Sequence, residues 1–171
     1  MINKPFFSIV IPALNEEKYL PLLLSDLAKQ TMKDFEDIVV DGKSEDNTVE
    51  LANSFSNSLP KLSSLTSDRR HVCTQRNMGV NNASGDVLIF SDADNRLPNY
   101  FLAGIKYKLE FHDADLITPW FKPDKSNTTN DTIAVGMNLG LELQKTLSNP
   151  MMLESLIAIK KQSFDQIGGF D

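Results

Sequence analysis

Short apolar runs alternate along the chain with longer stretches in which apolar residues recur at helical spacing. The runs at 6–11, 38–40 and 86–91 are rich in β-branched and aromatic residues, which is typical of buried strands. Leucines recur three and four residues apart in 17–29, which indicates an amphipathic helix. By the same criteria we expect further strands over 114–119 and 155–159, and further helices through Val49, Leu51 and Ala52 and over 71–83, 99–111 and 132–147.

This alternation of strands and helices predicts an α/β fold, a mostly parallel sheet with helices on both faces. The polar stretches 42–46 and 122–131 are expected to be loops, and the serine-rich stretch 54–67 carries only a weak signal. At 171 residues the chain has the length of one ordinary domain. We therefore treat residues 1–171 as a single domain.

Composition and charge exclude several classes of protein. Hydrophobic residues make up 41% and charged residues 23%, which is typical of globular proteins. The net charge of -6 argues against a nucleic-acid partner, because nucleic acids require a basic face. Cys73 is the only cysteine, so no internal disulfide forms and a reducing, cytoplasmic setting is expected. The sequence has no run of about 18 apolar residues that would span a membrane.

Polar and acidic residues follow three of the predicted strands. Asn15 and Glu17 follow the first strand, Asp41 ends the second, and Asp92 and Asp94 follow the strand at 86–91. In a parallel sheet these ends share one edge, which is where α/β proteins bind their ligands. Any one of these clusters could be a helix cap or a solvated loop. Three of them at equivalent strand ends favour a ligand site.

The sequence Asp92-Ala93-Asp94 is the strongest candidate for metal chemistry. Residues two apart in an extended segment point the same way, so both carboxylates can face one ligand. Hard carboxylate oxygens suit Mg²⁺ or Mn²⁺, which completes its coordination with phosphate oxygens and water. Such a metal would stabilise the charge that develops on a leaving diphosphate. The motif is common, and its place after an apolar strand is what makes it informative.

Four stretches of the sequence together resemble a known family. They are S-I-V-I-P-A-L-N-E-E (8–17), V-V-D-G-K-S-E-D-N-T (39–48), Q-R-N-M-G-V-N-N-A-S-G-D-V-L-I-F-S-D-A-D (75–94) and I-G-G-F-D (167–171). In this order and spacing they are similar to family 2 glycosyltransferases of the GT-A fold. The resemblance implies inverting transfer of a sugar from a nucleoside diphosphate sugar to an acceptor hydroxyl.

The resemblance also implies roles for particular residues. Asp41 would bind the base, commonly uracil in this family, so a UDP-sugar is expected, although guanosine donors also occur. Asp92 would lie near the ribose and the metal, and Asp94 would be the main metal ligand. The base and ribose pocket would be lined by Pro12, Ala13, Leu14, Asn15 and Glu17.

Some residues within the motifs admit more than one interpretation. Arg76, followed by Asn77 on a predicted helix, could approach the diphosphate or could be a surface charge. Gly79 is explained by close helix packing, and Gly85 by a helix C-terminus. Lys43 stands where many relatives have a small residue, and we expect it to be solvated.

The family's catalytic-base motif has no counterpart in this sequence. It is an acidic pair that follows G-G-F-D, and the sequence ends at Asp171. The resemblance therefore places the general base beyond Asp171, and predicts a chain that binds donor but transfers poorly, with the C-terminal acceptor part missing. Substitute bases would be Glu142, Glu154 or Asp171 itself.

Other functions are less well supported. The alternative is a non-catalytic module that binds nucleotide sugars. A sugar nucleotidyltransferase would need a glycine-rich N-terminal loop, which the sequence lacks, and no dinucleotide or P-loop motif is present. Trp120 and Phe121 could stack on a sugar, but core packing is the better interpretation. The acceptor is not specified, whether glycan or lipid-linked, and relatives that act on lipid-linked acceptors leave peripheral membrane association of the intact protein open.

Overall fold

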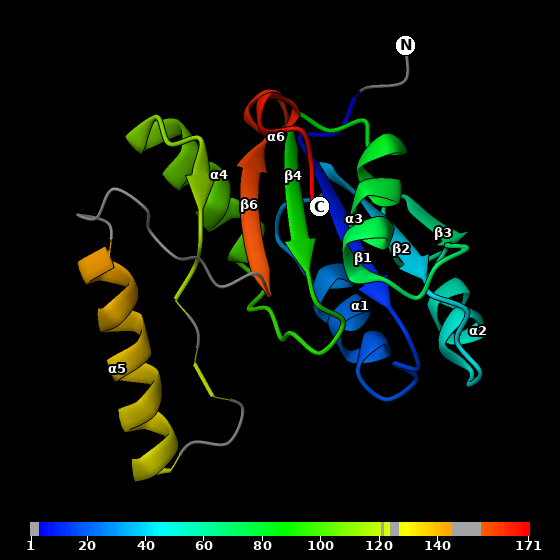
Figure 1. Cartoon of the computed structure of the whole chain (residues 1–171), viewed down its shortest axis with the longest axis horizontal. Helices are drawn as coiled ribbons and strands as arrows, with labels where there is room; N and C mark the ends of the chain where they lie inside the picture. The colour runs from blue at the N-terminus through cyan, green and yellow to red at the C-terminus, as the bar shows by residue number, and fades with distance from the viewer. Residues whose placement is uncertain (1–3, 121, 124–126, 145–154) are drawn as a thin grey trace.

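The computed structural model describes residues 4–120, 122–123, 127–144 and 155–171. A six-stranded sheet with strand order β3-β2-β1-β4-β6-β5 forms its centre (Figure 1). The strands are β1 (Phe7–Ala13), β2 (Phe35–Asp41), β3 (Leu62–Thr66), β4 (Val87–Ser91), β5 (Leu116–Ile117) and β6 (Leu156–Lys160). The helices are α1 (Leu20–Ala28), α2 (Thr48–Asn53), α3 (Val72–Asn81), α4 (Phe101–His112), α5 (Thr128–Gln144) and α6 (Lys161–Ile167).

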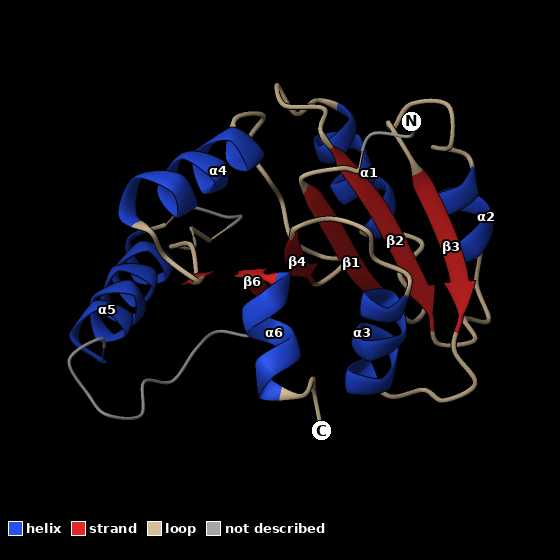
Figure 2. Cartoon of the chain, turned by 90° about the horizontal axis from the view of Figure 1, so that it is seen from above, coloured by secondary structure: helices blue, strands red, loops and turns tan. Residues whose placement is uncertain are grey.

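The sheet is mostly parallel, as the sequence predicts. Strands β3, β2, β1 and β4 run in the same direction, and β6 runs antiparallel to both β4 and β5. Figure 2 shows α1, α2 and α4 on one side of the sheet and α3 and α6 on the other. The expected α/β fold with helices on both faces is confirmed.

Strand β1 connects the two sides of the core. All seven of its residues are buried. Because side chains alternate along a strand, Ile9 and Ile11 pack in the cluster with α1 and α4, whereas Val10 packs in the cluster with α3 and α6. The continuous apolar run in the sequence is thus explained by a strand that is covered on both faces.

Two elements were missed by the sequence patterns. Strand β3 lies within the serine-rich stretch, and its residues are only half-buried or exposed, so it has little apolar signal. Helix α6 follows β6 directly, with only Phe164 buried. Each is short and lies at the margin of the core, where periodicity is weakest.

Three further expectations need correction. Helix α5 begins at Thr128, inside the stretch that was expected to be a loop, and the strand expected over 114–119 shortens to Leu116–Ile117. Trp120 is 66% exposed, so its predicted core role is wrong; its indole N–H donates to Glu142 Oε1 at 2.9 Å. Phe121 lies outside the described residues. No described helix is both long and apolar enough to span a bilayer.

Two glycines allow close contact between α3, its following loop and β1. A Cβ on Gly79 would lie 2.3 Å from Val10 Cγ1, which confirms the expected helix packing. A Cβ on Gly85 would lie 2.6 Å from the amide nitrogen of Ser8. Helix α3 already ends at Asn81, so the role of Gly85 is this close approach to β1, and not the helix C-terminus that the sequence suggested.

Two neighbouring carboxyl groups in β2 have opposite environments. Glu36 accepts hydrogen bonds from Ser8 Oγ and from the Ser84 amide and hydroxyl, each at 2.7 Å, and pairs with Lys61. Burial alone would raise its pKa, but these donors outweigh burial and lower the pKa to about 2. Asp37 is fully buried, and neither of its carboxylate oxygens has a hydrogen-bond partner among the described residues.

Asp37 therefore destabilises the fold when it is ionised. It lies between Ile9 and Leu62 of the adjacent strands. Burial, with a smaller contribution from Glu36, raises the pKa of Asp37 well above its usual value. The folded protein then holds a proton that the unfolded chain releases, so this group lowers stability as pH rises above about 4.

We predict that Asp37→Asn raises the free energy of unfolding at pH 7, by on the order of 1 kcal/mol or more, and has little effect near pH 4. Denaturant unfolding at both pH values measures this. Glu36→Gln is the matched control with the opposite sign. Its carboxylate contributes stability above pH 4.5 that is lost as pH falls towards 2, so the control should destabilise at pH 7. A stability loss in Asp37→Asn at pH 7 would contradict the prediction.

Candidate functional site

The carboxyl ends of β1, β2 and β4 lie at one edge of the sheet. Ala13, the last residue of β1, is in register with Asp41, the last residue of β2. Strand β4 pairs with the other side of β1 in the same direction and ends at Ser91. The loops that follow therefore start side by side, with Asp41 at the end of β2, Asn15 and Glu17 in the first loop, and Asp92 and Asp94 in the loop after β4.

The loops after β1 and β2 are held to each other by side-chain hydrogen bonds. Asn15 adopts a left-handed backbone conformation, with φ 57°, that asparagine tolerates well. Its backbone amide donates to Ser44 Oγ at 2.9 Å, and its side-chain Oδ1 accepts from the backbone amide of Glu45 at 2.8 Å. Glu17 Oε2 accepts from the amide and side chain of Asn47. Asn15 and Glu17 thus shape the edge that the sequence predicted them to line.

The first residues of the predicted pocket differ in exposure. Pro12 and Ala13 are buried at the end of β1, whereas Leu14 is 38% exposed. The Glu16 amide donates to Thr48 Oγ1 at 2.8 Å, which fixes this turn against the start of α2. A ligand at this edge would meet the backbone of the turn and the exposed Leu14 side chain.

Asp41 organises the loop between β2 and α2. One of its oxygens accepts from the amides of Lys43 and Ser44 at 2.9 and 3.1 Å, and the other accepts from the Ser44 hydroxyl at 2.5 Å. The side chain of Lys43 is exposed, as expected, and its ammonium lies 3.7 Å from Asp68. A further bond from the Ser44 amide, at 3.3 Å, makes four, which fills the roughly four acceptor positions of a carboxylate, and the residue is only 4% exposed. The structure therefore shows Asp41 as the residue that holds this loop.

Gln75 joins the ends of β1 and β2 from the helix side, and sequence reasoning gave it no role. Its Nε2 donates to the carbonyls of Ala13 and Val40, at 2.9 and 2.7 Å, and the residue is only 4% exposed. A Cβ on Gly42 would lie 3.2 Å from the same nitrogen, so glycine leaves room for this contact. The place of Gln75 directly before Arg76 was the only available signal.

Arg76 is buried and reaches the acidic edge. The residue is 3% exposed, and its Nη2 lies 3.0 Å from Asp92 Oδ1. The face of the Phe170 ring lies 5.1 Å from the centre of the guanidinium. The alternative that Arg76 is a surface charge is therefore wrong.

Acidic side chains from three loops converge here. Burial raises the pKa of Glu16, and the carboxylates of Asp94, Asp46 and Asp92 raise it further by repulsion. Asp94 is exposed and Asp92 is half-buried. Glu16, at the end of the first strand, thus belongs to the same negative patch as the Asp92-Ala93-Asp94 motif.

The loop that carries Asp92 and Asp94 is pinned to α1. Asp26 accepts two hydrogen bonds from the Arg96 guanidinium, at 2.7 and 3.0 Å, and one from the Leu97 amide at 3.1 Å. Gln30 continues the attachment by donating to Pro98 and accepting from the amide at the start of α4. Burial alone would raise the pKa of Asp26, but the bonds from Arg96 and Leu97 lower it. Asp26 and Gln30 gave no signal in the sequence.

A metal ion fits the chemistry of this edge only with additional ligands. No group of three or more histidine, cysteine or acidic side chains in the described part of the chain is arranged to hold one. Asp92 and Asp94 offer oxygen ligands at an exposed edge, and the mutual repulsion that raises the pKa of Glu16 marks a patch that favours a cation. Mg²⁺ and Mn²⁺ commonly use one or two protein carboxylates and complete their coordination with substrate phosphates, and Asp92 and Asp94 would supply such carboxylates.

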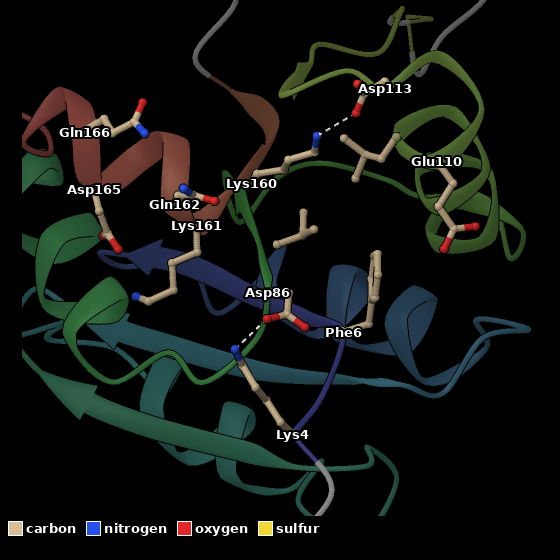
Figure 3. A pocket seen from close by; sticks show the side chains of 12 residues that line it. Lys4, Phe6, Asp86, Glu110, Asp113, Lys160, Lys161, Gln162, Asp165 and Gln166 are labelled. Carbon is tan, nitrogen blue, oxygen red and sulfur yellow. Dashed lines mark hydrogen bonds and ion pairs between the residues drawn. The ribbon is translucent and has the colours of Figure 1, made fainter.

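A hollow of about 860 Å³ lies at the opposite edge of the sheet, where β4 begins and β6 ends. Figure 3 shows Lys4 paired with Asp86, and Lys160 with Asp113, in its wall. These charges of the wall are thus paired, whereas the acids of the carboxyl edge repel one another. The chemistry favours the open carboxyl edge as the site.

The fold is that of the GT-A class of α/β proteins. The structure is similar to that of Staphylococcus aureus TarS in complex with UDP, with TM-score 0.75 and 23% identity over 94% of this chain and 48% of that one. It is also similar to the mannosyltransferase PcManGT from Pyrobaculum calidifontis, in complex with GDP-Man and Mn²⁺, with TM-score 0.79 and 21% identity over 99% of this chain and 48% of that one. At these identities the likeness shows the fold.

Sequence comparison gives the family. Residues 8–169 match the family described as Glycosyl transferase family 2, and the chain belongs to it. It is 42% identical over 94 residues to a PGL/p-HBAD biosynthesis glycosyltransferase of Mycobacterium tuberculosis, covering 54% of this chain and 37% of that protein. It is 32% identical over 114 residues to the poly(ribitol-phosphate) beta-N-acetylglucosaminyltransferase TarS of S. aureus, covering 65% and 20%. The matches therefore span well under half the length of these relatives.

We predict that Gln75→Glu lowers the free energy of unfolding by about 1–3 kcal/mol at pH 7, because a carboxylate would face two carbonyl oxygens without a donor. The loss should shrink at pH 4, where the protonated acid again donates one bond. Denaturant unfolding at the two pH values tests this. Asn81→Asp, the same amide-to-acid change at an exposed position of α3, should shift stability by less than about 0.5 kcal/mol. Equal losses in the two variants would contradict the prediction.

Proposed function

We propose that these residues bind a nucleoside diphosphate sugar, preferably a UDP-sugar, with a divalent metal, as the donor part of an inverting glycosyltransferase. The observation that carries this proposal is the carboxyl edge itself. Glu16, Asp46, Asp92 and Asp94 converge there, and the buried guanidinium of Arg76 faces Asp92. A diphosphate with its metal matches this arrangement, because the cation offsets the acids and the guanidinium bonds phosphate oxygens.

The proposed contacts follow the order of the loops. The base and ribose would lie over the turn from Pro12 to Asn15 and beside Asp41, whose loop is already rigid. Rigidity here favours binding, since less conformational freedom is lost when the ligand arrives. Asp94, the most exposed acid of the motif, would be the main metal ligand, with Asp92 shared between metal and Arg76. When bound, the metal would stabilise the charge that develops on the leaving diphosphate.

The comparisons support a nucleotide-sugar ligand without choosing among bases. TarS is solved with UDP and with UDP-GlcNAc, and PcManGT with GDP-Man and Mn²⁺. The preference for uridine rests on the family resemblance at Asp41. The sugar and the acceptor are left open.

We propose that the general base belongs to the acidic pair that follows G-G-F-D in the family motif, a pair that residues 1–171 do not contain. Of the candidate substitutes, Glu142 already accepts a hydrogen bond from the Trp120 indole, and Glu154 lies outside the described residues. General-base catalysis contributes about a hundredfold to ten-thousandfold. Residues 1–171 alone should therefore bind donor but transfer sugar slowly. Rapid transfer to an acceptor by these residues would contradict this assignment.

We predict that the protein binds UDP more tightly with Mn²⁺ than without it, and that Asp94→Asn loses at least about tenfold in affinity because the main metal ligand is neutralised. Titration calorimetry with UDP and GDP, each with and without Mn²⁺, measures this and identifies which nucleotide base the site prefers. Asp165→Asn, the same change at an exposed site on α6, is the control and should bind as the wild type does.

Two results would contradict the proposal. One is that the folded wild-type protein binds neither nucleotide. The other is that Asp94→Asn and Asp165→Asn bind UDP equally well with Mn²⁺ present. Binding without transfer, even in a version extended past Asp171, would instead favour the non-catalytic binding module.

A further inference from the structure

The side chain of Asn77, on α3, bonds both backbone groups of Phe170 in the C-terminal segment (168–171). Asn77 Nδ2 donates to the Phe170 carbonyl at 2.7 Å, and the Phe170 amide donates to Asn77 Oδ1 at 3.0 Å. The carboxamide thus satisfies both backbone groups of one residue, as a neighbouring β-strand would. This pair of bonds spans 93 positions of the sequence.

The backbone before Phe170 is shaped for this contact. Gly168 and Gly169 have φ values of 84° and 98°, in the left-handed region that favours glycine. A Cβ on Gly169 would lie 3.0 Å from Asn77 Oδ1. Side chains at these two positions would therefore strain or displace the segment.

The ring of Phe170 is fixed on the other side by aromatic packing. It makes an edge-on contact with Phe90 of β4, with centroids 4.9 Å apart, and a tilted one with Phe164 of α6 at 5.5 Å. Its face meets the Arg76 guanidinium at 5.1 Å, and that guanidinium reaches Asp92 at 3.0 Å. The order of contacts is thus Asn77, Phe170, Arg76, Asp92.

We infer that Asn77 and Phe170 position Arg76 for the diphosphate of the donor. Asn77 holds the backbone of Phe170, and the ring of Phe170 then lies against the guanidinium and limits the directions in which it can point. Neither residue needs to touch the ligand. The inference rests on the proposed function, since it assigns these residues to the phosphate end of that same site.

The experiment compares UDP with UMP, because only UDP carries the second phosphate that Arg76 would hold. In Asn77→Ala, the Kd for UDP with Mn²⁺ should rise roughly three- to tenfold. This is the effect of losing about one hydrogen bond, because Phe170 and hence Arg76 would be less well positioned. The Kd for UMP should change by less than about twofold. Phe170→Leu, which keeps the backbone pair but removes the ring face, should show the same selective loss. Asn82→Ala is the control, since that carboxamide, just past the end of α3, donates to the Met78 carbonyl of the same helix and makes no hydrogen bond to the segment 168–171 among the described residues.

Amide hydrogen exchange of Phe170 gives a readout that needs no ligand. Exchange should be protected in the wild type and in Asn82→Ala, and at least about tenfold faster in Asn77→Ala. Unchanged exchange would overturn the attachment, and unchanged UDP affinity, or equal losses for UDP and UMP, would overturn the positioning role. If Asn77→Ala does not fold, Phe170→Leu decides the question of positioning. Failure of the wild type to bind UDP or GDP would instead overturn the proposed function itself.

Discussion

The parallel pairing of β1 with β2 on one side and β4 on the other is the constraint on which the site depends. It brings Ala13, Asp41 and Ser91 to one edge, so that loops separated by up to about half the chain start as neighbours. A strand paired on both sides and covered on both faces favours apolar residues, and β1 is fully buried, with the hydroxyl of Ser8 bonded to Glu36. The polar residues of the site therefore lie at or just past the strand ends. The same pairing explains why Gln75 matters: it bonds the carbonyl of Ala13, the last residue of β1, and that of Val40, the last but one of β2.

A concentration of acids has a cost, and the structure offsets it with rigid loops. Repulsion from Asp94, Asp46 and Asp92 adds to burial in raising the pKa of Glu16. Such loops would spread apart if they were free to move. Hydrogen bonds between the β1 and β2 loops, and the Asp26–Arg96 pair behind the β4 loop, hold them in place. The proposed divalent cation would fit this arrangement, because binding it would relieve the repulsion.

Sequence patterns predicted the architecture and the acidic motif because both have strong local signals. Apolar runs mark β1, β2 and β4, and the family stretches mark Asp41, Asp92 and Asp94. The patterns failed where the determining contact is distant in sequence or weak. Strand β3 has no buried apolar face. The large apolar side chain of Trp120 suggested a core residue, but in the structure it is exposed. Gln75, Asp26 and Gln30 serve the site only through partners 35 to 72 residues away. No spacing within one segment could have revealed them.

Arg76 shows how a buried charge sets the character of the site. Removing a guanidinium from water is costly unless it is paired and hydrogen-bonded. Here the Asp92 carboxylate and the face of the Phe170 ring supply the compensation. A charge so enclosed cannot swing out to meet a ligand without losing these contacts. In the proposed complex the phosphate would therefore come to Arg76, and the geometry of the bound diphosphate would be set before it arrives. Preorganisation of this kind lowers the entropy lost on binding, and it would make the contacts of α3 with the C-terminal segment contribute to the proposed affinity of the site.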